Sequence, residues 1–456
     1  MAINYIEMRL EDCMDAIIDY RGKTPKKVDN GIPLITAKII KNGRIQEVSE
    51  FIAIDDYDNW MVRGLPLEGD VVLTTEAPLG EVAQLDARKV ALAQRVITLR
   101  GKKGTLENDY LLYLLQSSFV QNQLDGRASG STVTGIKQSE LREIILRLPP
   151  TALQKSISHQ LKCLDKKIDL NNKINQTLEQ ISQTLFKSWF VDFDPVIDNT
   201  LDAGNPIPEA LQSRAELRQK VRNSADFKPL PADIRALFPA EFEETELGWV
   251  PKGWILESVA KAININPSVK LPKNTVAKYV DMKSLPTQGY SISDVIEKPY
   301  AGGAKFQKND TLFARITPCL ENGKTGFVDF LDEQETAFGS TEFIVMRGTT
   351  KVHYSYVACL ARENNFRLHA IQNMVGSSGR QRVQNSCFDS FYIAVPTPSV
   401  MSLFAGKVSS YFDKMYCCNM ENKSLTNLRD TLLPKLISGE LSLEDLPDLV
   451  NQTEAA

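Results

Sequence analysis

The sequence predicts an α+β protein in which two β-rich domains are separated by a pair of long antiparallel helices, related by a pseudo-twofold internal repeat. Three observations lead to this prediction. Each half of the chain opens with short apolar alternations and turn residues, each such region closes with a strand that ends in proline, and each proline is followed by about 40 residues with heptad spacing.

The first β-rich domain is expected over residues 1–150. Short runs of β-branched and aromatic residues between turn signals predict its strands. These runs are residues 31–38, 69–85 and 91–100. An amphipathic segment at 110–123 predicts one short helix, and a Gly/Ser-rich loop at 128–138 leads into a last strand at 144–150.

The second β-rich domain is expected over residues 251–398, with the same order of parts. Its strand runs are residues 308–330 and 339–347. An amphipathic segment at 354–369, a Gly/Ser-rich loop at 375–384 and a strand at 391–398 follow. A displacement of 247 residues superposes Pro149 on Pro396 and Asn175 on Asn422, so the repeat is consistent in pattern although weak in identity.

The two long helices are expected over residues 151–190 and 399–440. Prolines stop the preceding strands and are compatible with the first turn of a helix. The seam between the two helices follows alternating three- and four-residue steps, and its buried asparagines cost stability but specify register. The predicted seam residues are Ile157, Leu161, Leu164, Ile168, Asn171, Asn175, Leu178 and Leu185 in the first helix, and Phe412, Met415, Asn422, Leu425, Leu428 and Leu432 in the second.

Between the halves, residues 191–250 predict a connector, and residues 441–456 a tail. Seven of the 22 prolines fall in 191–253. This composition favours an extended connector, with short helical pieces near 208–222 and 231–237.

Composition narrows the class of protein. No apolar stretch is long enough to cross a membrane and no secretory signal is visible, so we expect a cytoplasmic protein. Seven irregularly spaced cysteines and three histidines predict no metal site. The net charge is −4, but residues 251–398 carry 17 basic and 13 acidic residues, a net charge of +4. This balance permits nucleic-acid binding without requiring it.

Motifs for catalysis are not found. Gly323-Lys324-Thr325 resembles the end of a phosphate-binding loop, but Pro318 stands where that loop needs glycine, so a hairpin turn is favoured. No dinucleotide-type glycine pattern is present, and no histidine belongs to a plausible triad. We therefore expect a binding or scaffolding subunit without a catalytic residue or cofactor of its own. A self-sufficient DNA methyltransferase or nuclease, or a coiled-coil protein adaptor, remains the alternative.

Basic and small polar residues collect in turn-rich segments of both domains. Lysine and arginine position phosphates, and Arg, Asn, Gln or Lys read base edges. For any one residue, a solvated surface loop is as good an explanation, but the paired placement favours nucleic-acid contact. The candidates are Lys23, Lys26, Lys27, Lys38, Lys41, Arg44, Ser131, Thr132 and Lys137 in the first domain, and Arg315, Asn322, Lys324, Ser377, Ser378, Arg380 and Arg382 in the second.

Residues 164–196, LDKKIDLNNKINQTLEQISQTLFKSWFVDFDPV, closely resemble the central conserved region of the specificity subunits of type I restriction-modification systems. Residues 428–441 resemble the distal conserved region of that family. Recurrent sequences of its target recognition domains are similar to residues 69–83, 309–327, 338–347 and 376–383. The resemblance covers essentially the whole chain.

The resemblance implies a function. Each β-rich domain would be a target recognition domain for one half of a bipartite, asymmetric double-stranded DNA site. The helices would set the spacing and bind two modification subunits, which carry S-adenosylmethionine and the adenine methyltransferase site. Restriction subunits would add ATP- and Mg-dependent translocation and cleavage. The chain itself would catalyse nothing and direct its partners to DNA.

Overall fold

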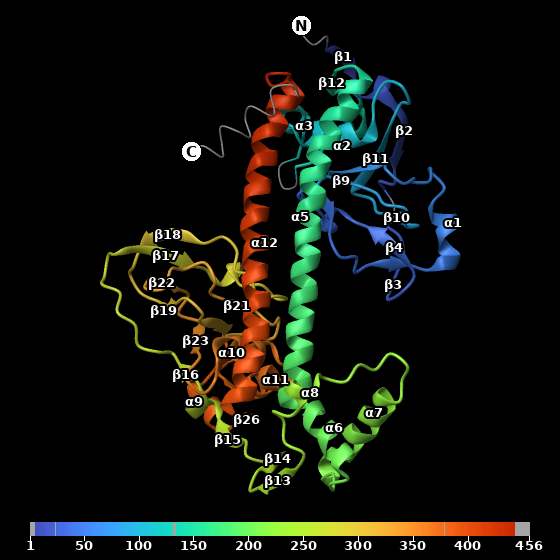
Figure 1. Ribbon diagram of the computed structural model, residues 1–456. Coiled ribbons are helices and arrows are strands. Elements are labelled where there is room, and N and C mark those ends of the chain that lie inside the picture. Colours follow the sequence, from blue (N-terminus) through green and yellow to red (C-terminus); the bar gives the residue numbers. More distant parts are fainter. Residues whose placement is uncertain (1–4, 23, 131–133, 378, 443–456) are drawn as a thin grey trace. The chain divides into compact units, whose positions relative to one another are not determined.

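The computed structural model describes residues 5–22, 24–130, 134–377 and 379–442, with helices and strands labelled in Figure 1. The chain divides into two compact units, Met1–Asp169 with Asn422–Ala456, and Leu170–Glu421. We call residues 5–150 the first head and residues 251–397 the second head. The division passes through both long helices, so each unit contains one head and a segment of each helix. The predicted fold class is confirmed.

The long helices lie where the heptad spacing predicts them. Helix α5 spans Thr151–Phe186 and continues as a π-helical turn, Lys187–Val191, and α12 spans Pro398–Ser438. Proline is tolerated in the first turn of α12 because its missing N–H would have no partner inside the helix. Within each unit the segments of α5 and α12 run antiparallel, side by side (Figure 1).

The first head contains two four-stranded sheets, in the strand orders β2-β11-β8-β9 and β10-β4-β7-β3. Helices α2 and α3 share a hydrophobic core with α5 and α12. The strands are β1 (Ile6–Arg9), β2 (Met14–Asp19), β3 (Lys27–Val28), β4 (Ile32–Ile35), β5 (Ile40–Lys41), β6 (Arg44–Ile45), β7 (Phe51–Ile52), β8 (Val71–Thr75), β9 (Leu79–Gln84), β10 (Ala91–Leu92), β11 (Val96–Gly101) and β12 (Ile145–Leu148). The helices are α1 (Tyr57–Trp60), α2 (Asn108–Gln116), α3 (Ser118–Arg127) and α4 (Gln138–Arg142).

The second head also contains two four-stranded sheets, β16-β23-β20-β21, which has the same strand order as β2-β11-β8-β9, and β18-β17-β22-β19, in which the order differs. Strand β4 pairs parallel with β10 in the first head, and β17 pairs parallel with β22 in the second. The strands are β15 (Ile255–Ser258), β16 (Asn264–Ile265), β17 (Val276–Val280), β18 (Ile296–Pro299), β19 (Ala304–Gln307), β20 (Thr311–Ala314), β21 (Thr325–Phe327), β22 (Thr336–Gly339), β23 (Phe343–Arg347), β24 (Met374–Val375), β25 (Arg382–Val383) and β26 (Tyr392–Val395). The helices are α9 (Val259–Ala262), α10 (Tyr354–Arg362) and α11 (Asn364–Gln372).

A buried ion pair recurs at the same place in both heads. Asp70, just before β8, accepts bonds from Nε and Nη2 of Arg100 at 2.8 Å each. Asp310, just before β20, accepts bonds from Nε and Nη2 of Arg347 at 2.6 and 2.7 Å. Each carboxylate is fully buried and also accepts a backbone N–H three residues upstream. Because an unpaired buried carboxylate is costly, these pairs constrain the two central strands of each sheet.

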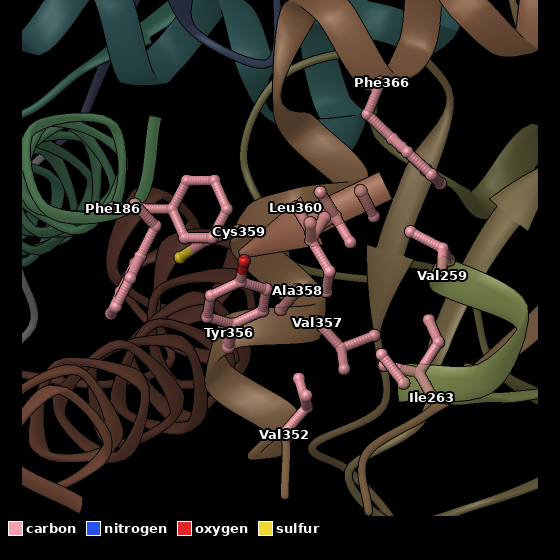
Figure 2. Close-up of a cluster of buried hydrophobic side chains, with 14 of the residues drawn as sticks. Phe186, Val259, Ile263, Val352, Tyr356, Val357, Ala358, Cys359, Leu360 and Phe366 are labelled. Atoms are coloured by element: carbon pink, nitrogen blue, oxygen red, sulfur yellow. The ribbon is translucent and has the colours of Figure 1, made fainter. Parts of the chain in front are cut away.

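Large aromatic side chains form the core of the second unit. Phe186 at the end of α5 packs edge to face with Tyr356 of α10, and Phe190 in the following π-helical turn packs edge to face with Phe404 of α12. Figure 2 shows Phe186 and Tyr356 beside Cys359, with the apolar residues of α10 extending toward Val259 of α9 and Ile263, which follows that helix. Helix α10 therefore connects the helix segments of this unit to the strands of its head.

Two sequence predictions of helices need correction. The segments 110–123 and 354–369 are each two helices rather than one. The breaks fall at Ser117 and Glu363, which both have extended backbone, with ψ of 147° and 136°. Each break has a local partner, since the Ser117 hydroxyl donates to the Leu114 carbonyl and Glu363 accepts the Phe366 N–H. These side-chain bonds replace the helical backbone bonds lost at the break.

The prediction of an extended connector is wrong at residues 194–203, which form α6. Helix α6 (Asp194–Ala203) packs with α7 (Gln212–Arg222), and arginines of α7 bind aspartates of α6 in bidentate pairs. These pairs are Arg214 with Asp194 and Arg218 with Asp198. The pairing is tertiary, so apolar periodicity does not reveal it. The connector also contains α8 (Ala232–Arg235), β13 (Phe242–Thr245) and β14 (Gly248–Pro251).

Most predicted seam residues lie in or against the cores of the units. Asn171 donates to Glu421 and Asn175 to Asn419, at 2.8 Å each, between α5 and α12. Leu428 is the exception, with 40% of its surface exposed, because the inward position one residue later belongs to Arg429. Ile157, Leu161, Ile168, Asn171, Phe412, Met415 and Leu432 are buried, and Leu164, Asn175, Leu178, Leu185, Asn422 and Leu425 are partly buried.

Candidate nucleic-acid interface

Two predicted lysines of the first head share one carboxylate beside a surface pocket. The Glu50 carboxylate lies 2.7 Å from Lys27 Nζ and 3.8 Å from Lys38 Nζ, and the Lys38 side chain is 80% exposed. Both lysines line a pocket of about 200 Å³, together with Gln94 and Arg95. One carboxylate cannot neutralise two ammonium groups, so this surface keeps a net positive charge. Lys26 and Lys41 are exposed nearby in sequence.

Arg44 lies in a different environment. Its Nε is 2.5 Å from Asp169 and its Nη2 is 3.2 Å from Asp165, both on α5. A guanidinium with two carboxylate partners and a 26% exposed side chain has little charge left for phosphate. The geometry favours a structural role for Arg44, connecting the first head to α5.

The Gly/Ser-rich loops of the two heads are held in matching ways. Ser129 and Gly135 form a β-bridge in the first head, and β24 pairs with β25 in the second. An arginine anchors each loop at a carbonyl. Arg21 Nη1 donates to Ile136 at 2.8 Å, and Arg315 Nη2 donates to Val383 at 2.9 Å. Among the predicted contacts, Lys23, Ser131, Thr132 and Ser378 lie outside the described residues.

The remaining candidates divide into exposed and engaged side chains. Lys137, Asn322, Ser377 and Arg380 are exposed. Lys324 donates to the Met282 carbonyl at 2.8 Å, and Arg382 forms an ion pair with Glu342 at 2.7 Å. Hydrogen bonds from Arg382 hold the pKa of the Glu342 carboxyl below its ordinary value, so this glutamate is charged at neutral pH.

In each head three chain segments meet at one end of a four-stranded sheet, β2-β11-β8-β9 in the first head and β16-β23-β20-β21 in the second. We call this arrangement the strand-end frame. It comprises residues 75–78, 93–96 and 134–137 in the first head, and residues 315–318, 340–343 and 380–383 in the second. The first segment follows a central strand, the second precedes its neighbour, and the third belongs to the Gly/Ser-rich loop.

The backbone bonds of the two frames correspond. Thr75 N donates to the Arg95 carbonyl at 3.0 Å, and Arg315 N donates to the Glu342 carbonyl at the same distance. The N–H of Ile136 bonds the Thr75 carbonyl in the first frame. The N–H of Val383 bonds the Arg315 carbonyl in the second. Thus one backbone arrangement carries different side chains in the two heads.

The comparisons with known proteins agree on one family. Residues 4–180 match the model of the type I restriction modification DNA specificity domain. The HindI specificity subunit of Haemophilus influenzae is 26% identical over 73% of this chain and 76% of its own length. The MjaIX specificity subunit of Methanocaldococcus jannaschii is 25% identical over 83% of this chain and 79% of its own. Over most of its length, this chain is therefore similar to type I restriction-modification specificity subunits.

A solved structure supports the fold of this chain. The crystal structure of a type I restriction-modification system S subunit from M. genitalium has a TM-score of 0.53, with 14% sequence identity. The match covers 95% of this chain and 96% of the other. The shared architecture therefore includes both heads and both long helices.

Two features are absent from the described residues of this chain. No helix among residues 5–22, 24–130, 134–377 and 379–442 is long and apolar enough to cross a membrane. In the same ranges, no three His, Cys, Asp or Glu side chains are grouped so that they could hold a metal ion.

Sequence reasoning missed the arginine that organises one candidate loop of the second head. Arg362 of α10 donates to the carbonyls of Gly323 at 2.7 Å and Thr325 at 2.6 Å, and to that of Thr287 at 2.9 Å. Burial lowers the pKa of Arg362 to about 10. The side chain thus anchors the turn that carries Asn322 and Lys324. An arginine at the end of an amphipathic helix gives no local signal of such a role.

Proposed function

We propose that this chain is the non-catalytic subunit that gives a type I restriction-modification complex its DNA sequence specificity. Each head reads one half of a bipartite, asymmetric site in double-stranded DNA, and α5 and α12 set the spacing between the half-sites. One observation carries this proposal. The two heads share the strand order of one four-stranded sheet, a buried Asp–Arg pair and a backbone frame, yet present different side chains from the same positions. Related scaffolds with different surfaces suit two different half-sites.

The partners follow from the family. Two modification subunits bind the helical region and supply S-adenosylmethionine and the adenine methyltransferase site. Restriction subunits supply ATP-driven translocation and Mg-dependent cleavage. This chain needs no cofactor of its own, because its task is to place the partner active sites on the correct sequence.

Phosphate contacts are proposed where cations are exposed at the heads. These contacts position the duplex and carry no sequence information themselves. The proposed residues are Lys26, Lys27, Lys38, Lys41 and Lys137 in the first head, and Asn322, Ser377 and Arg380 in the second. With a net charge of −4, the chain alone binds DNA weakly, and the partner subunits provide much of the positive surface around the duplex.

Methylation mapping tests the function. The chain is expressed with its cognate modification subunit in a host without adenine methylation, and modified adenines are mapped by single-molecule sequencing. A culture without the chain is the control. We expect a split motif that is methylated only when the chain is present.

Methylation that does not change when the chain is omitted would contradict the proposal and favour the protein adaptor. Binding of S-adenosylmethionine to the purified chain alone, with methylation of DNA, would instead favour a self-sufficient methyltransferase.

A further inference from the structure

The two strand-end frames present ion pairs of opposite arrangement. In the first head, Arg95 lies directly before β11 and its Nε is 2.8 Å from Glu76, which follows β8. In the second head, the residue directly before β23 is Glu342, and its partner is Arg382 of the Gly/Ser-rich loop, 2.7 Å away. The residue before the strand is thus an arginine in one frame and a glutamate in the other, and its partner comes from a different segment in each.

The two frames differ in this way because their loop segments carry different residues at one position. Gly135 occupies the position in the first head that Arg382 occupies in the second, since each forms the β-bridge to the strand-end segment. A Cβ at Gly135 would lie 3.0 Å from the Glu76 Cβ and 3.0 Å from the Thr75 carbonyl. A side chain at position 135 would therefore be crowded against the strand-end segment. In the first frame the partner of Arg95 comes from the strand-end segment, and in the second the partner of Glu342 comes from the loop.

These ion pairs are exposed enough to exchange partners. The side chains of Arg95 and Glu76 are 48% and 40% exposed, and those of Arg382 and Glu342 are 42% and 23% exposed. Exposed ion pairs add little to stability, so DNA can replace the partner at low cost. The buried Asp70–Arg100 and Asp310–Arg347 pairs, in contrast, hold the strands beneath the frames.

An adjacent guanidinium and carboxylate match the two edges of one base pair. In the major groove guanine offers the N7 and O6 acceptors, which arginine binds in bidentate fashion, and cytosine offers an N4 amino donor to a carboxylate. An arginine beside a glutamate therefore reads a G·C pair. In the second head a glutamate stands where the first head has Arg95. The second frame would therefore read the base pair in the opposite orientation.

We propose that the strand-end frame of each head is a base-reading site for one G·C pair. Arg95 and Glu76 are the readers in the first head, and Arg382 and Glu342 are the readers in the second. This assignment rests on the proposed function and deepens it, because it places specificity in particular residues. It also explains how two heads with one fold recognise different half-sites.

The test compares motifs methylated by complexes that carry variant chains. Arg95→Ala should relax one G·C position in a single half-site, with discrimination there falling by about 10- to 100-fold, while the other half-site is unchanged. Glu342→Gln should relax one position in the opposite half-site. Arg88→Ala is the matched control, because Arg88 forms an exposed ion pair with Asp86 outside the frame of the first head.

The double variant Glu76→Arg with Arg95→Glu distinguishes a role in base reading from a purely structural role, because it retains an ion pair in the frame. We expect the motif to change at the position that Arg95→Ala relaxes. An unchanged motif in the exchange variant would overturn the proposal. So would loss of all methylation by both first-head variants while the complex still co-purifies, because the pair would then be structural.

Results with the wild-type chain distinguish a failure of the proposed function from a failure of the frame assignment. If it directs no bipartite methylation at all, the proposed function fails. If it directs a bipartite motif that either lacks a G·C pair in one half or is unaffected by the variants, the function stands and the frame assignment fails.

Discussion

Asp165 of α5 and Arg429 of α12 form an ion pair inside the first unit, with 2.9 Å between Oδ1 and Nη1. The same aspartate accepts a hydrogen bond from the Tyr113 hydroxyl at 2.7 Å and one from Arg44 at 3.2 Å. One carboxylate thus connects both long helices to the first head. The side chains of Asp165 and Arg429 are only 22% and 15% exposed, so water screens the pair weakly.

Replacement of Asp165 should therefore destabilise the first unit. In Asp165→Asn, two arginines lose a shared carboxylate in a partly buried place, and we expect a loss of about 2–4 kcal/mol. Thermal unfolding of the full chain, followed by circular dichroism, measures the effect. Asp430→Asn is the control, since Asp430 also pairs with Arg429 but is 60% exposed, and should cost under about 1 kcal/mol. Equal losses would mean that the Asp165 cluster is not a structural centre.

The inward face of α12 can be tested with two leucines. Leu432 is 9% exposed within the core of the first unit, and Leu428 is 40% exposed. Leu432→Ala should cost about 2–4 kcal/mol, because it leaves a cavity, whereas Leu428→Ala should cost under about 1 kcal/mol. Urea unfolding of the two variants gives the comparison. If Leu428→Ala lost more stability than Leu432→Ala, Leu428 would belong to the helix seam, as heptad spacing alone predicts.

Asp329 predicts a pH dependence of the stability of the second unit. Burial raises the pKa of its carboxyl to about 6. The folded state therefore binds this proton more tightly than the unfolded state, and stability falls as pH rises from about 4 to about 6. At pH 7, Asp329→Asn should stabilise the unit by roughly 1–3 kcal/mol, with a smaller effect at pH 4.

Thermal midpoints at the two pH values check this sign. Asp332→Asn, at an exposed position three residues away, serves as the control and should leave the difference between pH 4 and pH 7 unaltered. Destabilisation by Asp329→Asn at pH 7 would show that the folded chain requires the charged carboxylate.

Lysines of the first head should contribute to the salt dependence of DNA binding. Each phosphate contact contributes about 0.9 to the slope of log Kobs against log salt concentration, so Lys26→Ala with Lys38→Ala should reduce the slope by about 2. Fluorescence anisotropy of the assembled complex between about 50 and 200 mM salt measures it. Lys252→Ala removes an exposed lysine that is paired with Glu241 of the connector, and should leave the slope as it is. An unaltered slope in the double variant would remove these lysines from the interface.

The long helices and most strands were predictable because their causes are local. Heptad spacing and the prolines before residues 151 and 399 identify α5 and α12 within a few residues. Alternating apolar residues identify β8, β11, β20 and β23. The helix breaks were not predictable, because Ser117 and Glu363 are compatible with helix and end it through bonds to particular neighbours.

The candidate site was predictable only in part. Positive charge and turn composition identify the loops that carry Lys27, Lys38 and Arg382, but not which side chains remain free. Arg44 satisfies the same local criteria as Lys38, yet it pairs with two aspartates of α5 that lie over 120 residues away in sequence. Glu76, Arg95 and Glu342 have no pattern of their own, because their proximity depends on strand pairing.

By itself the sequence determined the repeated plan of this protein, its two long helices, the strands of its heads and its resemblance to type I specificity subunits. These features follow from periodicity, turn residues and long matched segments, all of which are properties of neighbouring residues. Only the tertiary structure decided which charged side chains form ion pairs with other parts of the chain and which face solvent. It placed Arg429 rather than Leu428 against α5, and it brought Arg95 to Glu76 and Arg382 to Glu342. Ion pairs between distant segments depend on the packing of strands and helices, and that packing has no counterpart in local sequence.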